Sequence, residues 1–158
     1  MGMDVATVAT AVCCGVVAGV FFAFSVCIMQ ALERRPAAQG MAAMQQINRT
    51  IVNSPFILAF VGAAILCVVL AVWSLVSWDG GRSPWILGGA ALYLLGGIVV
   101  TGAANVPLND TLDAADPRGA GAAAQWDHYV RVWTAWNHVR TVTGIAATAL
   151  LIIAARAD

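Results

Sequence analysis

The chain contains no lysine, and only 10% of its 158 residues are charged. Soluble domains usually have about a quarter of their residues charged, so this composition excludes an ordinary water-soluble globular protein. The formal net charge is zero, which is not typical of the basic surface that a nucleic-acid partner requires. The composition therefore predicts the lipid bilayer as a partner and does not predict nucleic acid.

What the chain has in place of charge is apolar sequence, since 61% of its residues are hydrophobic. Four long apolar runs cover roughly residues 5–32, 56–78, 85–106 and 133–155. At 1.5 Å per residue, a helix of about 22 residues crosses a hydrocarbon core of about 30 Å. The alternating pattern of a membrane β-barrel is missing from these runs. The sequence predicts an all-α fold, a membrane four-helix bundle, in a single transmembrane domain over residues 1–158.

The first apolar run is not typical of a cleaved signal peptide. It begins beside Asp4, has no basic segment before it, and is longer than the apolar part of a signal peptide. We expect it to remain in the mature protein, an integral multi-pass protein of a bacterial inner membrane. The first and third loops contain most of the arginines, and the positive-inside rule therefore favours a cytoplasmic position for these long loops.

The connections between the runs differ in length. Residues 79–84 form a short Asp-Gly-Gly turn, which predicts a hairpin of the second and third helices. The first loop contains a helix start signal at Pro36, followed by apolar residues at helical spacing: Met41, Met44, Ile47 and Ile51. We expect an amphipathic helix at about residues 37–53, lying over one mouth of the bundle. Residues 119–124 of the third loop are rich in alanine and glycine and are a candidate lid or linker.

Polar residues interrupt the start of the fourth run, where burial in a membrane makes them costly and hence candidates for function. Helical geometry, at about 100° per residue, places four of them on one arc and His138 on the neighbouring face. The four are Trp133, Trp136, Asn137 and Arg140. The alternative is structural, because tryptophans anchor helices at the membrane interface and Arg140 can extend toward the headgroups.

Two asparagines, Asn105 and Asn109, end the third apolar run four residues apart. They share a face if the helix continues through Pro107. We expect them to face the polar arc of the fourth helix. Tyr129 precedes that arc on a possible extension of the same helix.

Several motifs occur in a fixed order along the chain. They are Gly19-Val-Phe-Phe-Ala-Phe, Met44-Gln-Gln-Ile-Asn48-Arg49, Asn53-Ser-Pro-Phe, Thr101-Gly-x-x-Asn105-Val-Pro-Leu-Asn109 and Trp133-x-x-Trp136-Asn137-x-x-Arg140. Together they resemble the anthrone oxygenase family over nearly the whole chain. The resemblance implies an integral membrane protein, and fungal members of similar plan oxidise polyketide anthrones to anthraquinones with O2 without a known cofactor.

The first hypothesis is therefore an oxygenase that takes an apolar or aromatic small molecule. A base must remove an acidic proton, and His138 is the candidate because imidazole titrates near neutral pH. Arg140 and Asn137, with Asn105 and Asn109, are expected to stabilise the resulting oxyanion. The remaining expected substrate contacts are flat rings and a covering helix: Trp133, Trp136, Tyr129, Asn48 and Arg49. No metal and no cofactor are expected under this hypothesis.

Two alternatives remain open. One is a non-catalytic membrane protein that binds a quinone or lipid, or an accessory subunit of a membrane complex. The other is haem or copper held by His128 and His138. The four cysteines are interpreted as packing residues, since they form no Cys-x-x-Cys pair: Cys13, Cys14, Cys27 and Cys67. A homo-oligomer is possible through the alanine and glycine faces.

Overall fold

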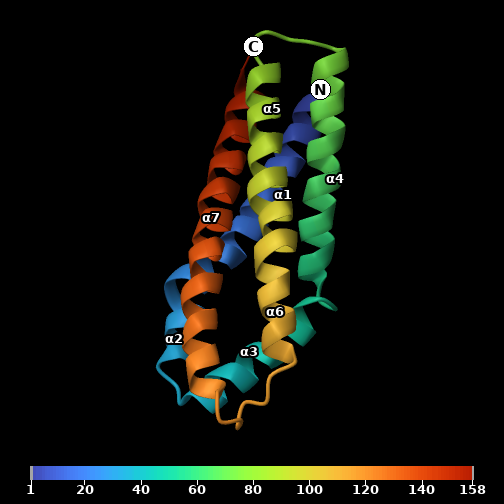
Figure 1. Cartoon of the computed structure of the whole chain (residues 1–158). Coiled ribbons are helices and arrows are strands. Elements are labelled where there is room, and N and C mark those ends of the chain that lie inside the picture. The colour runs from blue at the N-terminus through green and yellow to red at the C-terminus, as the bar shows by residue number, and fades with distance from the viewer. Residues whose placement is uncertain (1, 158) are drawn as a thin grey trace.

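The structure is a computed structural model and describes residues 2–157. Within that range every regular element is a helix. Four helical segments are long and apolar enough to cross a membrane: Asp4–Glu33, Pro55–Val76, Ser83–Asp113 and Ala122–Arg156. The predicted all-α four-helix bundle is confirmed, and the chain is a multi-pass membrane protein (Figure 1).

Two of the spans are not simple α-helices. The first span joins α1, the π-helical segment η1 and α2, and the third joins α5, two π-helical segments and α6. In chain order the elements are α1 (Gly2–Ala23), η1 (Phe24–Ile28), α2 (Met29–Glu33), α3 (Ala37–Ile51), α4 (Pro55–Val76), α5 (Ser83–Leu92), η2 (Tyr93–Val99), η3 (Thr101–Asn105), α6 (Val106–Asp113) and α7 (Ala122–Arg156). The fourth span, α7, is a single helix that begins well before the apolar run at Trp133.

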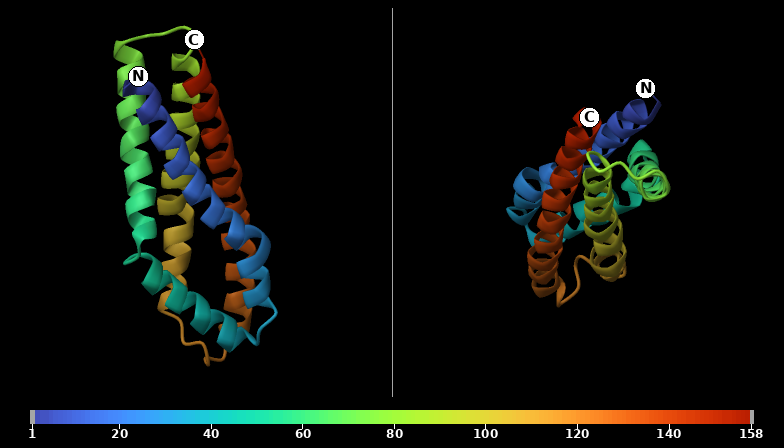
Figure 2. Two further views of the ribbon diagram at one scale, coloured as in Figure 1. Left: turned by 180° about the vertical axis from the view of Figure 1, so that it is seen from behind. Right: turned by 90° about the horizontal axis from the view of Figure 1, so that it is seen from above.

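Helix α7 packs against both α1 and α5, and α4 packs against the same two helices. The two chain ends lie together at one end of the bundle, and α3 crosses the opposite end (Figures 1 and 2). Met41 and Met44 on α3 are fully buried. Amphipathicity explains this position, because the apolar face of α3 covers the mouth while Gln46 and Thr50 face outward.

The bundle has two clusters of buried apolar side chains. The cluster near the chain ends contains small residues, with Cys14 and Cys67 in contact at 3.9 Å between their sulfur atoms. The cluster near α3 contains methionines and aromatic rings, among them Trp126 and Tyr129. All four cysteines are free thiols, and Cys27 is exposed. The second cluster borders the polar residues described below.

Two features of the third span differ from the sequence expectation. Pro107 does not end the helix: it lies in the first turn of α6, directly after the π-helical segment η3, and the backbone is helical on both sides of it. The third loop is correspondingly shorter, at residues 114–121, and residues 122–124 of the expected lid belong to α7.

Gly96 in η2 allows α7 to approach closely, since a Cβ there would lie 2.0 Å from Oγ1 of Thr143.

Candidate functional site

The polar residues of the spans meet where η1 and η3 face α7. Segments of π-helix frequently occur at functional sites because the wider turn changes the direction of its side chains. Here η1 contributes Phe24 and Ser25, and η3 contributes Thr101 and Asn105. Both segments lie within hydrogen-bonding or ring-contact distance of α7.

Asn137 is at the centre of this region and has no exposed surface. Its Nδ2 donates to the carbonyl of Phe21 and to Oγ of Ser25, both at 2.8 Å. Its Oδ1 accepts a 2.7 Å hydrogen bond from Nη2 of Arg140. The Asn137 side chain therefore uses both of its polar atoms to connect α1 and η1 with the guanidinium of Arg140.

Arg140 is only 5% exposed. Its Nη1 donates to Oγ1 of Thr101 at 3.1 Å, while its Nε is buried without a hydrogen-bond partner among the described residues. The guanidinium carbon lies 4.3 Å from the ring centre of Phe21 and 5.0 Å from that of Trp133. The ion pairs seen in the described part of the chain involve Arg49 and Arg82, and none neutralises Arg140. A buried cation without a counter-charge is costly, so the site favours an anion.

The two predicted asparagines of the third span hold Trp133 in place. Oδ1 of Asn109 accepts hydrogen bonds from Tyr129 Oη and from Trp133 Nε1, both at 2.8 Å. Asn105 is buried, and its Nδ2 donates to the Trp133 carbonyl at 3.2 Å. The rings of Trp126, Tyr129 and Trp133 stack in sequence along α7. Asn105 therefore stabilises the backbone of α7 at Trp133 and does not line the cavity described below.

A cavity of about 130 Å³ lies in front of Arg140, and we call it the Arg140 cavity. Side chains from α1, η1, α3, α4, η3, α6 and α7 line it. Most are apolar, five are aromatic and four are polar: Phe21, Phe24, Phe56, Phe60 and Trp133, with Asn48, Thr101, Asn109 and Arg140. The lining contains no Asp, Glu, His or Cys side chain. The cavity therefore offers hydrogen-bond donors and one positive charge within aromatic surroundings.

The covering helix contributes an amide to this cavity. Asn48 on α3 lines it, and the buried Nδ2 of Asn48, which lies near the Tyr129 hydroxyl, makes no hydrogen bond of normal length and angle within the described residues. A buried donor without a partner loses its hydration free energy, which a ligand oxygen would restore. Asn48 and Arg140 are therefore two separate donors to one ligand.

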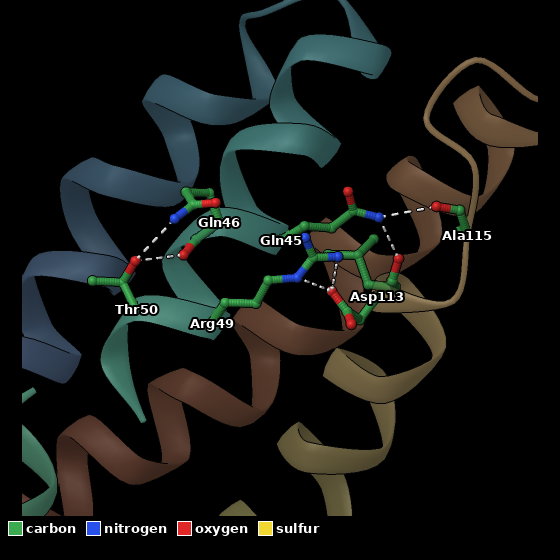
Figure 3. Close-up of polar contacts among 7 residues, drawn as sticks. Gln45, Gln46, Arg49, Thr50, Asp113 and Ala115 are labelled. Carbon is green, nitrogen blue, oxygen red and sulfur yellow. Dashed lines mark hydrogen bonds and ion pairs between the residues drawn. The ribbon is translucent and has the colours of Figure 1, made fainter. Parts of the chain in front are cut away.

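Contacts with the end of α6 fix α3 over the cavity (Figure 3). Gln45 Nε2 donates to the carbonyls of Leu112 and Ala115 at 2.8 and 3.0 Å. Arg49 pairs with Asp113 at 2.7 Å. Arg49, an expected substrate contact, thus forms an ion pair with α6 and does not line the cavity.

The structure brings together some of the predicted site residues and separates others. Asn48, Asn109, Trp133 and Arg140 line the cavity, and the side chains behind them are Asn105, Asn137 and Tyr129. The sequence predicts Trp136 on the same arc, but it lies at the edge of that arc, is 42% exposed and does not line the cavity.

The two histidines lie away from the Arg140 cavity. His138 is exposed and lines a separate hollow with Glu33, Asp127 and Arg131, on the side of α7 that faces α2. His128 is exposed and lines another hollow beside Thr111. The expected base therefore does not line the Arg140 cavity.

Sequence reasoning missed most of the cavity lining. Phe21, Phe24, Phe56 and Phe60 supply four of its five rings, and Thr101 holds the Arg140 guanidinium. Phenylalanine in a membrane helix carries no signal of its own, since lipid contact and core packing use the same residue type. The available signal was the spacing of the rings, three residues apart in the first span, from α1 to η1, and four apart on α4, which places each pair on one helix face.

Comparison with known protein families places this arrangement in context. A family model described as anthrone oxygenase matches residues 56–150. The chain belongs to the anthrone oxygenase family. No curated protein and no solved structure matches it.

The matched region of this anthrone oxygenase family member contains α4, the third span and most of α7. Asn105, Asn109, Trp133, Asn137 and Arg140 all lie within it. The cavity residues contributed by α1, η1 and α3 lie outside the match, Asn48 among them. Arg140 and the two residues that bind its guanidinium, Asn137 and Thr101, thus lie in the part of the chain that the family model matches. Helix α3 lies outside it.

Proposed function

We propose that this member of the anthrone oxygenase family oxidises an enolic or phenolic aromatic substrate with O2 in the Arg140 cavity, in a bacterial inner membrane. The observation that carries the proposal is the guanidinium of Arg140, which is buried beside aromatic rings without a carboxylate partner in the described part of the chain. An enolate or phenolate supplies both the missing negative charge and a flat ring.

Each group of residues in the site has its own role in binding the substrate. Arg140 binds the oxyanion, while Asn137 and Thr101 hold the guanidinium in the orientation that does so. Asn48 and Asn109 offer amide groups to a second oxygen of the substrate. The rings of Phe21 and Trp133 pack on its faces. No metal or cofactor takes part in these contacts.

The bound anion reacts with O2 because its negative charge makes it an electron donor. The enolate passes one electron to O2, and the substrate radical and superoxide then join through a new C–O bond. The peroxide takes up a proton, its O–O bond breaks, and the remaining hydrogen leaves the same carbon. One oxygen atom becomes the new carbonyl, and the other leaves as water with the two hydrogens of the original methylene group. Apolar surroundings admit O2 and exclude water from the peroxide stage.

The proton of the substrate is lost before the substrate is buried. No acid, histidine or thiol side chain lines the cavity, so no residue there is placed to act as the base. Arg140 makes up for this by stabilising the anion relative to the neutral form, which favours entry of the ionised substrate. His138 is left without a role in the cavity under this proposal.

The same absence of a base from the lining favours one alternative, the binding of a quinone without chemistry. Quinone carbonyls accept hydrogen bonds from Arg140, Asn48 and Asn109 and need no proton removal. The two functions differ in whether O2 is consumed.

O2 uptake by the full chain in lipid nanodiscs tests the proposal. The substrates are 1,8-dihydroxyanthrone, with three rings, and 2,6-dimethylphenol, with one. We expect uptake and quinone formation with at least one of them, and loss of both in Arg140→Met. Arg131→Met is the matched control, because Arg131 is exposed on the same helix. Unchanged uptake in Arg140→Met would contradict the proposal, and tight quinone binding without uptake of O2 would support the alternative.

A further inference from the structure

Helix α3 forms one wall of the Arg140 cavity. Four of its lining residues belong to that helix: Met44, Ile47, Asn48 and Ile51. We propose that α3, fixed to the end of α6, restricts the ligand to an anionic phenol or enol of a single ring. This inference rests on the proposed function and narrows its substrate class.

The volume of the cavity is the first argument. An apolar cavity of about 150 Å³ accommodates one benzene molecule. The Arg140 cavity, at about 130 Å³, has room for one ring with a small substituent. A three-ring ligand needs roughly two further rings of space, so it would extend beyond the cavity unless a wall is displaced.

Helix α3 is one wall that a larger ligand would have to displace, and its contacts oppose displacement. Gln45 Nε2 donates to the carbonyl of Leu112 in α6 and to that of Ala115 in the loop that follows, and the exposed side chain of Arg49 pairs with Asp113 (Figure 3). At its other end α3 packs tightly on Trp126, because a Cβ at Gly40 would lie 2.8 Å from that ring and 2.8 Å from the Leu32 carbonyl. Helix α3 is thus held at both ends.

The charges of the lining select the form of the ligand. Arg140 provides the positive charge, and Asn48 and Asn109 provide amides, while the lining has no carboxylate. A cation or a neutral ring leaves the guanidinium unpaired, whereas a phenolate pairs with it. A second oxygen on the ring would meet the unpaired Nδ2 of Asn48.

A phenolate with a free para position undergoes the same oxidation as an enolate. The para carbon bonds to O2 after electron transfer, the peroxide takes up a proton, and the O–O bond breaks as the para hydrogen leaves. The products are a para-quinone and water. Phenol, as the simplest case, loses two hydrogens and gains one oxygen atom, and the second oxygen atom forms the water.

Binding of coloured probes to the full chain in nanodiscs tests the size restriction. The one-ring anion is 4-nitrophenolate, the three-ring anion is 2-hydroxyanthraquinone, and nitrobenzene is the neutral one-ring control. The binding signal is the spectral change that Arg140→Met removes, which separates cavity binding from partition into lipid. We expect 4-nitrophenolate to bind at least about tenfold more tightly than either other probe.

A second experiment removes the contacts that hold α3 against α6. Gln45→Ala combined with Arg49→Ala removes the contacts with α6, and we expect the three-ring anion to gain at least about tenfold in affinity. Gln46→Ala is the matched control, because Gln46 bonds only Thr50 on the same helix in the described structure. Circular dichroism confirms that each variant remains folded, and Gln45→Ala alone is the milder variant if the double one is not.

The two proposals fail in different ways. Equal Arg140-dependent binding of the one-ring and three-ring anions by the wild-type chain would overturn the size restriction and leave the anion site intact. Absence of an Arg140-dependent signal for both anions would overturn the anion site and with it the proposed function. Oxidation of 2,6-dimethylphenol but not of 1,8-dihydroxyanthrone would support both.

Discussion

Nη2 of Arg140 donates a 2.7 Å hydrogen bond to Oδ1 of Asn137, one turn earlier on α7. Asn137 has no exposed surface, and its amide nitrogen is bound to the Phe21 carbonyl and to Ser25. An amide supports the guanidinium without neutralising it, whereas a carboxylate in the same place would neutralise it. The choice of Asn at this position therefore preserves a net positive charge for a ligand.

Asn137→Asp tests this relationship directly. An aspartate would form an internal ion pair with Arg140, so we expect affinity for 4-nitrophenolate to fall by about tenfold or more. It would also place a carboxylate against the Phe21 carbonyl, and some loss of thermal stability is expected. Binding is measured in nanodiscs below the melting transition of the variant. Unchanged affinity would show that the charge of Arg140 does not hold the anion.

Asn109→Leu tests the acceptor shared by Tyr129 and Trp133. Both donors would lose their hydrogen bond in a buried environment, at about 1–3 kcal/mol for each unsatisfied group. We expect a lower melting temperature and a changed tryptophan emission, since Trp133 lines the cavity. Thr111→Val is the control, because Thr111 is exposed nearby and its hydroxyl bonds only the backbone of its own helix. Equal melting temperatures for the two variants would contradict the prediction.

Gly96→Ala tests the contact between η2 and α7. The added Cβ would lie 2.0 Å from Oγ1 of Thr143 and 2.4 Å from its Cβ, so the helices must separate. Overpacking of this kind typically costs about 1–3 kcal/mol. Gly62→Ala is the matched control in α4, where a Cβ would meet nothing within 4 Å. In detergent, the melting temperature should fall markedly for Gly96→Ala and change little for Gly62→Ala.

Burial in a membrane explains which site residues can be predicted from the sequence. Asn105, Asn137 and Arg140 are polar residues in apolar runs, and the cost of burying them makes them recognisable from the sequence alone. The four phenylalanines of the cavity have no such cost, so the sequence does not distinguish them from lipid-facing rings such as the exposed Phe22. The four spans and the covering helix can be predicted because their apolar patterns are long and periodic.

Helical periodicity fixes angles between residues but not the direction of the neighbouring helix. It places Trp136 on the same arc as Asn137, yet Trp136 is exposed and does not line the Arg140 cavity. Tyr129 is expected on an extension of α7, but the start of that helix at Ala122 is not predicted, for another reason. The apolar run begins only after three polar or charged residues, although the helix includes all three of them: Asp127, His128 and Arg131.

His138→Gln provides the last prediction. His138 is exposed and lies on the side of α7 that faces Glu33 and Arg131, outside the Arg140 cavity. If the substrate enters as an anion, removal of the imidazole should change O2 uptake by less than about twofold, while Arg140→Met should abolish it. The pH profile of uptake distinguishes the two possible origins of the proton step. Loss of activity in His138→Gln, restored by added imidazole, would show that His138 is the base and that the cavity opens toward it during the reaction. An unchanged profile would assign the titration to the substrate, since Gln cannot accept the proton that His138 accepts.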